Sequence, residues 1–561
     1  MSLILNTVAF LLGGLGLFLL GMRFLSDGLQ TIAGPSLKSL IGAVTNNRVL
    51  GVVVGVIVTC LVQSSAITTV MTIGFVNAEM MLLKQAIGVI MGANIGTTVT
   101  GWVLVLNIGK YGLPLAGICG LAFCFVKSER IKYSAYAILG VGLVFIGLEA
   151  MKDSLTPLAA SDEVKNVFAM FAANSFLGII KCVIIGCIVT ALVQSSSATL
   201  GVTIAIACQG LISFETAAAL ILGQNVGSTI TAFIASIGTS RAARRTALFH
   251  IIFNVVGVVW VILLFRPYLA VINFFLAHVM NIPSADAVVV QNGVNVRPYI
   301  TTAIATYHTA FNLINLIVFL PFTGIIANLL ERFYAQKSTH KKLVATKLDY
   351  PLLSSPFAAI TQSGREIVSM SSKVQGMLTD LRICLNGGPD FKKRRDAIFA
   401  DEDLLDSAQE EMTNFLSQLL SSRVSQSVTN DAEKQLRMCD DLESASDYVT
   451  QILKLDLRLR DNNLEYNKAH VDGLLTLHQM NENLMQYLLR FLATPHDTAL
   501  LNDIRNEGAQ ITKRARELRS MHWSKLSQEQ TDPLISTTYT DMLSSYRKIK
   551  EHLVLVAEAA A

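Results

Sequence analysis

Charged residues are scarce in this sequence and unevenly distributed. Asp, Glu, Lys and Arg make up only 15% of the 561 residues, whereas hydrophobic residues make up 52% and the mean hydropathy is +0.50. These values exclude an ordinary soluble enzyme along the whole chain. Of the charged side chains, 25 lie in residues 1–330 and 61 in the last 231 residues. We therefore expect a membrane domain followed by a soluble domain.

The sequence also lacks the patterns that accompany several classes of function. Its eight cysteines show no CxxC spacing and no Cys/His cluster, which argues against a zinc or redox centre. The net charge is +7 for residues 1–330 and −3 for the rest, too small to indicate nucleic-acid binding. No nucleophile is patterned with a general base, so we expect no enzyme. The N-terminus has no basic segment and no small-residue cleavage site. Residues 4–20 are therefore interpreted as a retained first membrane span rather than a removed signal peptide.

The membrane half contains two polar clusters inside apolar runs. Polar groups there are costly unless they have partners, so the clusters indicate function. A Gly-x-Asn-x-Gly-x-Thr element follows each cluster, and equivalent residues are always 131 positions apart. The candidate binding residues are, in the first copy, Gln63, Ser64, Ser65, Asn94 and Thr98, and in the second, Gln194, Ser195, Ser196, Ser197, Asn225 and Thr229.

Two interpretations of these clusters compete. If a helix breaks at each one, its exposed N–H groups and the hydroxyls form a neutral cradle for an oxyanion, and its freed carbonyls can hold sodium. Alternatively, the hydroxyls bond to their own helices and the glycines only allow close packing. The duplication favours the first interpretation for the clusters. The Gly-Asn elements, which lack a lysine and a preceding strand, are not a Walker A loop.

The apolar runs predict roughly eight to ten membrane elements in two related units, at about 1–150 and 151–330. Ile4–Gly21 approaches the length of a span, and Arg23 and Asp27 mark its exit, whereas Val49–Val62 is too short to cross and suits a broken or re-entrant helix. The basic turn at 241–245 is expected in the cytoplasm. Two related units are the usual layout of secondary transporters, but the span count leaves parallel and inverted repeats open.

Two similar His-Asn pairs follow, His250 with Asn254 and His308 with Asn312. The i, i+4 spacing places each pair on one helical face. The pairs could handle protons or anions, but we favour a hydrogen-bonded pair that fixes helix packing. Arg297 is either an anion contact or a loop charge.

After a linker at 333–356, residues 357–561 show apolar stripes of helical period. Ile367, Met370, Val374, Met377 and Leu381 form one such stripe. With further helical patterns at 468–493, 499–520 and 533–558, we expect a bundle of about six helices.

Two carboxylate pairs lie in this tail, Glu402 with Asp406 and Glu443 with Asp447. Each pair occupies one helical face. Together they could hold a divalent metal, or they form a solvated acidic face.

These motifs together resemble the type II sodium/phosphate cotransporter family, whose hallmark is a duplicated Q-S-S element. The tail is similar to a PhoU-like domain at Leu348–Pro356 and Glu443–Asp447. The resemblance implies an all-α protein with inverted membrane repeats and a soluble helical bundle. It also implies sodium-coupled transport of inorganic phosphate across a bacterial inner membrane, with sodium as the coupling ion and a cytoplasmic sensor or gate. Ala66 stands where the second copy has Ser197, so the halves are expected to be unequal.

Two other functions remain open at this stage. The chain could export phosphate or carry another oxyanion, or it could be a non-transporting receptor or anchor that signals through its bundle. The tail could bind a regulatory partner or form a homo-oligomer.

Overall fold

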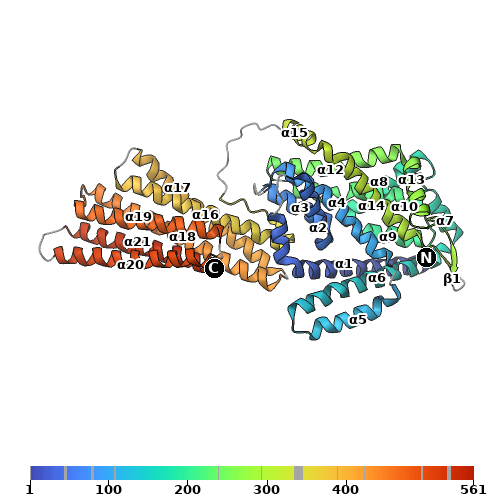
Figure 1. Ribbon diagram of the computed structural model, residues 1–561, viewed down its shortest axis with the longest axis horizontal. Coiled ribbons are helices and arrows are strands. Elements are labelled where there is room, and N and C mark those ends of the chain that lie inside the picture. Colours follow the sequence, from blue (N-terminus) through green and yellow to red (C-terminus); the bar gives the residue numbers. More distant parts are fainter. Residues whose placement is uncertain are drawn as a thin grey trace. The chain divides into compact units, whose positions relative to one another are not determined.

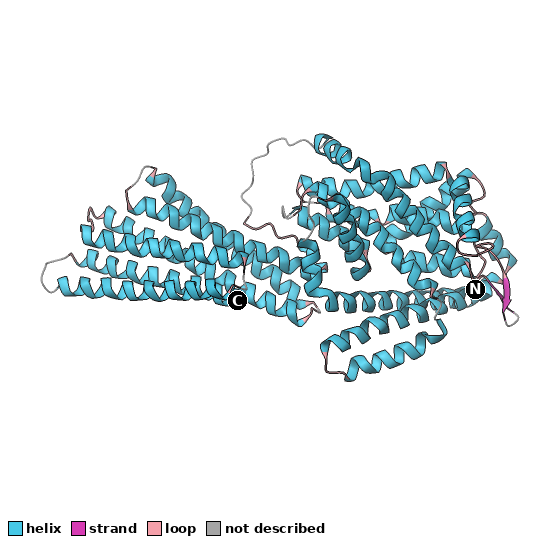
Figure 2. Ribbon diagram, viewed as in Figure 1, coloured by secondary structure: helices cyan, strands magenta, loops and turns pink. Residues whose placement is uncertain are grey.

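Apolar helices form nearly all of the first of two units, Met1–Lys337 and Ser338–Ala561. The structure is a computed structural model, and it describes residues 2–42, 47–77, 81–106, 109–237, 239–291, 294–333, 345–387, 390–422, 424–494, 497–526 and 532–561. Helix dominates both units, and the described strands are the antiparallel pair β1 (Val289–Gln291) and β2 (Val294–Val296) (Figure 2). The expected all-α class is confirmed.

The first unit contains fifteen α-helices in its described residues, and Figure 1 labels most of them. They are α1 (Ser2–Gly42), α2 (Arg48–Val62), α3 (Ser65–Asn77), α4 (Leu83–Val105), α5 (Gly109–Phe125), α6 (Glu129–Ala159), α7 (Asp162–Ala169), α8 (Phe176–Val193), α9 (Ser196–Cys208), α10 (Phe214–Gly227), α11 (Thr229–Ala235), α12 (Arg241–Leu263), α13 (Phe265–His278), α14 (Ile300–Phe319) and α15 (Thr323–Phe333). A 3-10 turn, Leu320–Phe322, joins the last two.

Seven helical segments within the described residues are long and apolar enough to cross a membrane. They are Leu5–Ala33, Leu83–Val105, Glu129–Ala159, Phe176–Val193, Phe214–Ala235, Arg241–Leu263 and Ile300–Arg332. Large apolar side chains on α5, such as Leu113 and Phe125, are mostly exposed, as expected for groups that face lipid. The first unit is therefore a polytopic membrane domain. Four further apolar helices, α2, α3, α5 and α9, have only 13 to 17 residues.

The first helix is longer than its sequence pattern indicates. We expected it to leave the membrane at Arg23 and Asp27, but α1 continues as a helix to Gly42. Arg23 and Asp27 form an i, i+4 ion pair of 3.7 Å between exposed side chains, which is compatible with an unbroken helix. Charged side chains thus lie along this helix without ending it.

Close helix contacts through glycine recur at the 131-residue offset. A Cβ atom added to Gly92 of α4 would collide with the carbonyl oxygen of Val52 in α2. A Cβ atom added to Gly223 of α10 would collide with the carbonyl oxygen of Val183 in α8. Small residues of this kind let backbones approach closely in a membrane. Each pair of helices is therefore held by the same contact.

Contacts with α14 give the directions of α4 and α10, the helices that carry Asn94 and Asn225 and are here called the Gly-Asn helices. Gly101 near the end of α4 lies against Ala305 in the first half of α14, whereas the earlier Ile87 shares an apolar cluster with the later Phe319. Helix α4 therefore runs antiparallel to α14. Phe214 at the start of α10 contacts the Tyr307 ring, and Asn225 contacts Asn312 further along. Helix α10 therefore runs in the same direction as α14.

The second unit is a helical bundle. Its elements are a 3-10 turn, Tyr350–Ser354, and α16 (Pro356–Leu385), α17 (Phe391–Ser421), α18 (Gln426–Asp461), α19 (Lys468–Ala493), α20 (Thr498–Leu526) and α21 (Pro533–Ala560), which run alongside one another in Figure 1. Six helices confirm the expectation, and the stripe from Ile367 to Leu381 is buried in the common core. Of the linker expected at 333–356, residues 334–344 lie outside the described residues.

We expect Gly92→Ala to destabilise the membrane unit by about 1–3 kcal/mol, because the added methyl group has no space beside Val52. Gly13→Ala is the matched control, since a Cβ at Gly13 meets no atom within 4 Å. Thermal unfolding of the purified protein in detergent would measure both. Equal melting temperatures for the two variants would contradict the proposed contact.

Candidate functional site

Both Gln-Ser-Ser clusters lie where one helix ends and the next begins. Gln63 follows α2 in the left-handed backbone region with φ 54°, and Gln194 follows α8 with φ 55°. Each main-chain N–H bonds back to a threonine carbonyl one turn earlier, at 2.7 Å and 2.8 Å respectively. The left-handed region is unfavourable for residues other than glycine, so the two turns share the same backbone strain.

The first cluster forms the tip of a helical hairpin. The Thr59 hydroxyl of α2 donates to the Thr68 hydroxyl of α3 at 2.9 Å. Further from the tip, Val54 and Thr72 line one small cavity between the same two helices. The two helices therefore run antiparallel. Helices α8 and α9, around the second cluster, also pack against each other.

The serines cap the second helix of each pair. Ser64 Oγ accepts a hydrogen bond from the Ile67 N–H, and Ser195 Oγ accepts one from the Ala198 N–H, each at 3.2 Å. The first N–H groups of a helix have no partner inside that helix, and they carry partial positive charge. Each tip therefore offers N–H groups and serine hydroxyls suited to an anion.

Thr100 of α4 connects the first cluster with the second. Its hydroxyl donates to Gln63 Oε1 at 3.3 Å and lies 3.5 Å from Ser197 Oγ. Thr100 is only 2% exposed. We did not include Thr100 among the candidate site residues, although its 131-residue relationship to Thr231 is a signal that could have found it. Tertiary contact thus brings Gln63 and Ser197 to one place.

Thr231, the equivalent of Thr100, makes no corresponding contact between the two clusters in the described residues. The Thr231 hydroxyl donates to the Ser228 carbonyl at 2.7 Å. The position equivalent to Ser197 is Ala66, which has no hydroxyl. Gln194 is exposed, whereas Gln63 is half-buried. The two halves of the candidate site are therefore unequal in the structure as well.

The four candidate residues of the Gly-Asn elements divide into two kinds. Asn94 Nδ2 lies 3.5 Å from Asn254 Oδ1, and Asn312 Nδ2 lies 3.5 Å from Asn225 Oδ1, so each asparagine contacts another helix. Thr98 donates instead to a carbonyl of its own helix at 2.8 Å. Thr229, the first residue of α11, donates to the Val226 carbonyl of α10 at 2.7 Å. Both threonines thus follow the alternative in which a hydroxyl bonds to a carbonyl three residues earlier.

Helix α1 supports the first tip from behind. Ser26 Oγ donates to the Val62 carbonyl at 2.6 Å and accepts from Gln30 Nε2 at 2.8 Å. The Val62 carbonyl belongs to the last turn of α2, whose carbonyls lack partners inside the helix. Nothing in the motif spacing pointed to Ser26.

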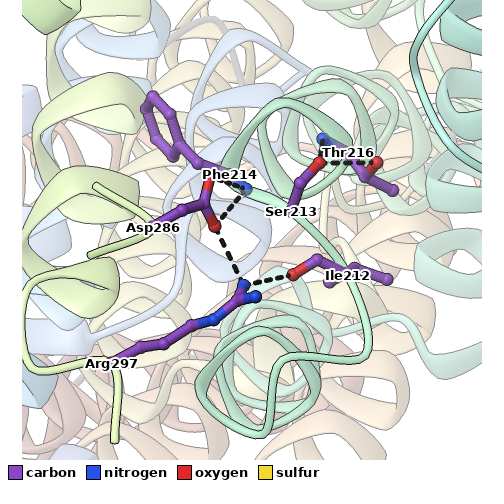
Figure 3. A network of polar contacts seen from close by, with 6 residues as sticks. All are labelled: Ile212, Ser213, Phe214, Thr216, Asp286 and Arg297. Carbon is purple, nitrogen blue, oxygen red and sulfur yellow. Dashed lines mark hydrogen bonds and ion pairs between the residues drawn. The ribbon is translucent and has the colours of Figure 1, made fainter. Parts of the chain in front are cut away.

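Arg297 is not an isolated loop charge, because it contacts the segment that leads into α10 (Figure 3). Its guanidinium lies 2.9 Å from Asp286 Oδ1 and donates to the Ile212 carbonyl at 3.1 Å. Asp286 in turn accepts the Phe214 N–H at 3.1 Å. A carboxylate at a helix N-terminus is stabilising. These contacts favour a structural role for Arg297 over an anion contact.

Comparison with known proteins identifies the family of the membrane unit. The family model described as Na+/Pi-cotransporter matches residues 17–153 and 151–267, most of the first unit. The chain belongs to the Na+/Pi-cotransporter family. It is accordingly a membrane transport protein and not an enzyme. No solved structure matches the chain.

Three relatives show how far the similarity extends. The Escherichia coli K12 protein YjbB, named for inorganic phosphate export, is 24% identical over 484 residues, which cover 86% of this chain and 83% of YjbB. Bacillus subtilis YqeW is 26% identical over 314 residues, 56% of this chain and 94% of YqeW. The human sodium-dependent phosphate transport protein 2B is 37% identical over 98 residues, 17% of this chain and 14% of that protein.

Three of the four candidate acidic residues of the second unit lie together, and Glu402 is not part of that group. One carboxylate oxygen each from Asp406, Glu443 and Asp447 lies within 4.8 Å of the others. Burial, reinforced by the neighbouring carboxylates, raises the pKa of Glu443, Asp447 and Glu402. Oxygen ligands in this number suit a divalent cation such as Mg²⁺ or Ca²⁺. Asp406 and Asp447 are exposed, so a solvated acidic face also fits this geometry.

We expect Asp447→Asn to stabilise α17 and α18 at pH 7 by up to about 1 kcal/mol. A carboxyl whose pKa is raised by folding destabilises the fold once it ionises. The advantage of the variant should therefore shrink as the pH falls from 7 towards the raised pKa values. Hydrogen exchange of the α17 and α18 amides in the full-length protein would measure it.

The control for this comparison is Asp503→Asn, which neutralises an exposed carboxylate on α20 and should leave exchange unchanged. Millimolar Mn²⁺ or Mg²⁺ should slow exchange in the wild type more than in Asp447→Asn. If the variant exchanges faster than the wild type at pH 7, the carboxylates do not repel one another.

Proposed function

We propose that the first unit transports inorganic phosphate coupled to sodium, with the binding site where the two Gln-Ser-Ser tips meet. The observation that carries this proposal is the contact of Thr100 with both Gln63 and Ser197. Gln63 and Ser197, which are 134 positions apart in the sequence, are thereby brought together. The family name and the human relative named for sodium-dependent phosphate transport support the substrate and the ion.

The chemistry of the tips suits both species. The N-terminal N–H groups of α3 and α9, with the hydroxyls of Ser65, Ser196 and Ser197, can bind phosphate oxygens without a cationic side chain. A neutral cradle allows release as well as binding, which transport requires. Sodium favours oxygen ligands, and the carbonyls at the ends of α2 and α8 with the Gln63 and Gln194 amides supply them.

Inverted repeats are the second element of the proposal. Helices α4 and α10 are equivalent at the 131-residue offset, yet α4 runs antiparallel to α14 and α10 runs in its direction. Equivalent helices that run in opposite directions are the hallmark of inverted-topology transporters. We propose that the two tips enter from opposite sides and that α2–α3 and α8–α9 are re-entrant hairpins.

The orientation follows from charge. With Arg241, Arg244 and Arg245 in the cytoplasm of a bacterial cell, α12 leads outward and α14 returns inward. The second unit then lies in the cytoplasm below the inner membrane. We propose that it acts as a PhoU-like regulator, with a divalent metal at the converging carboxylates and with a homo-oligomer or partner protein as its means of regulation.

Phosphate export is the second candidate function. The relative YjbB, which is named for export, aligns with 86% of this chain and therefore extends into the second unit. A symporter runs in either direction with the imposed sodium gradient, so both directions are measured in proteoliposomes. Phosphate efflux that needs no sodium gradient, or efflux without any uptake under an inward sodium gradient, would favour export.

We expect the purified chain in proteoliposomes to take up labelled phosphate only with an inward sodium gradient. Gln194→Ala together with Ser195→Ala should reduce uptake at least tenfold, because the second tip loses a sodium ligand and its helix cap. Uptake that survives the double substitution would rule out this site. Absence of flux with binding of a partner protein to the tail would favour a receptor.

Thr100→Val should reduce sodium-dependent phosphate uptake about tenfold or more, because it removes the hydroxyl that links Gln63 to Ser197. Thr231→Val is the matched control. Thr231 occupies the position equivalent to Thr100, but its hydroxyl donates to the Ser228 carbonyl three residues earlier. Uptake by Thr231→Val should therefore change less than threefold. Equal losses in both variants would show that the two halves contribute alike.

A further inference from the structure

Two buried histidines of the membrane unit are not explained by helix packing. His250 of α12 is 1% exposed and His308 of α14 is 5% exposed. Neither ring nitrogen of His250 has a hydrogen-bond partner among the described residues, and Nδ1 of His308 has none. Buried polar atoms in native proteins are nearly always paired, so these unpaired atoms call for a ligand or a solvent molecule.

The hydrogen bonds expected between each histidine and its asparagine do not involve the imidazole rings. Asn254 Nδ2 donates to the main-chain carbonyl of His250 at 2.9 Å, and Asn312 Nδ2 donates to that of His308 at 3.0 Å. Each predicted pair is thus hydrogen-bonded through the main-chain carbonyl of the histidine, and the imidazole ring takes no part in that bond. The asparagines do not bond to the imidazole rings, because each asparagine amide donates to the main-chain carbonyl one turn earlier.

Each histidine belongs to a cluster that adjoins a Gly-Asn helix. On one side Asn254 contacts Asn94 of α4, and on the other Asn312 contacts Asn225 of α10. Asn312 Oδ1 is itself buried without a partner in the described part of the chain. The same three residue types, His-Asn-Asn, thus recur at both equivalent helices.

Both clusters lie close to the meeting point of the tips. His308 precedes Thr309, whose hydroxyl accepts the Trp102 Nε1–H at 2.9 Å, and Trp102 lies two residues after Thr100. Asn94 lies six residues before Thr100 on α4, about 9 Å along the helix axis. Both clusters therefore lie on helices that contact α4, the helix whose Thr100 links the two tips.

We propose that His250 and His308 select protonated oxyanions by accepting the hydrogen of a phosphate P–OH group. A neutral imidazole offers one N–H donor and one nitrogen acceptor. Hydrogen phosphate and arsenate carry both an O–H donor and acceptor oxygens, whereas sulfate carries acceptors alone. The acceptor nitrogen faces a lone pair when sulfate binds, so sulfate is rejected. This inference rests on the proposed phosphate transport and names the groups that set its substrate class.

The test compares phosphate and sulfate in wild type and His308→Leu. Phosphate uptake into proteoliposomes is measured with arsenate or sulfate as competitor, and binding is measured as the phosphate-induced rise in melting temperature in detergent. A site built to hydrogen-bond a substrate hydroxyl rejects an analogue without it strongly. We expect the ratio of sulfate to phosphate inhibition constants to fall at least tenfold in His308→Leu, with arsenate still equivalent to phosphate. His250→Leu should act in the same direction.

Two further variants separate selectivity from folding. His308→Gln keeps a donor and an acceptor and should restore most of the discrimination. Tyr307→Phe is the control, because its hydroxyl is also buried without a partner in the described residues, but its ring packs against Phe214 and Tyr268. Its selectivity should equal that of the wild type. The melting temperature without phosphate should not fall in His308→Leu, as it would for a histidine that only stabilises packing.

Three results decide between the hypotheses. An unchanged sulfate-to-phosphate ratio in both leucine variants overturns the inference while phosphate transport stands. A lower melting temperature of His308→Leu without phosphate, together with a sulfate-to-phosphate ratio in His308→Gln and His250→Gln that is as low as in the leucine variants, also overturns it. Wild-type protein that shows no flux but whose melting temperature rises with phosphate and not with sulfate refutes the proposed transport and supports the inference.

Discussion

The membrane unit depends on how it satisfies main-chain polar groups where two helices stop inside an apolar environment. An unpaired N–H or C=O costs several kcal/mol in hydrocarbon, so a helix break must be covered by protein or by a ligand. Here each break reuses the same local solution. A glutamine in the left-handed region closes the first helix onto a threonine carbonyl, and the next serine caps the second helix. The remaining main-chain and hydroxyl groups at each break are candidate ligands for a cation or an anion.

Close packing of glycines makes these breaks possible. The carbonyl of Val52 occupies the space that a side chain at Gly92 would need, and Val183 does the same at Gly223. Each interrupted helix is thereby held through its backbone against a neighbouring helix, α2 against α4 and α8 against α10. The strain at Gln63 and Gln194 is then maintained by contacts outside the turn itself. Rigid support of this kind keeps the tips in register with the Gly-Asn helices.

The two halves are related but differ in structure. Thr100 contacts both Gln63 and Ser197, whereas in the described residues Thr231 donates to the Ser228 carbonyl, and Ala66 occupies the position equivalent to Ser197. Helix α4 is continuous, whereas its counterpart divides at Ser228 into α10 and α11. The two halves thus differ both at the tips and in the equivalent helices.

The sequence alone determined the membrane domain, the six-helix bundle and the paired polar clusters, because span length, helical period and a constant 131-residue offset are local properties of the chain. The stripe from Ile367 to Leu381 is buried as its spacing predicts. Only the tertiary structure brought Thr100 and Ser26 to the first tip and Asp406 of α17 to the carboxylates of α18. Only it directed Arg297 to Asp286 and left Nδ1 of His308 and both ring nitrogens of His250 without partners in the described residues. Those outcomes depend on which helix faces lie opposite one another, and no spacing within a single segment encodes a contact with a distant segment.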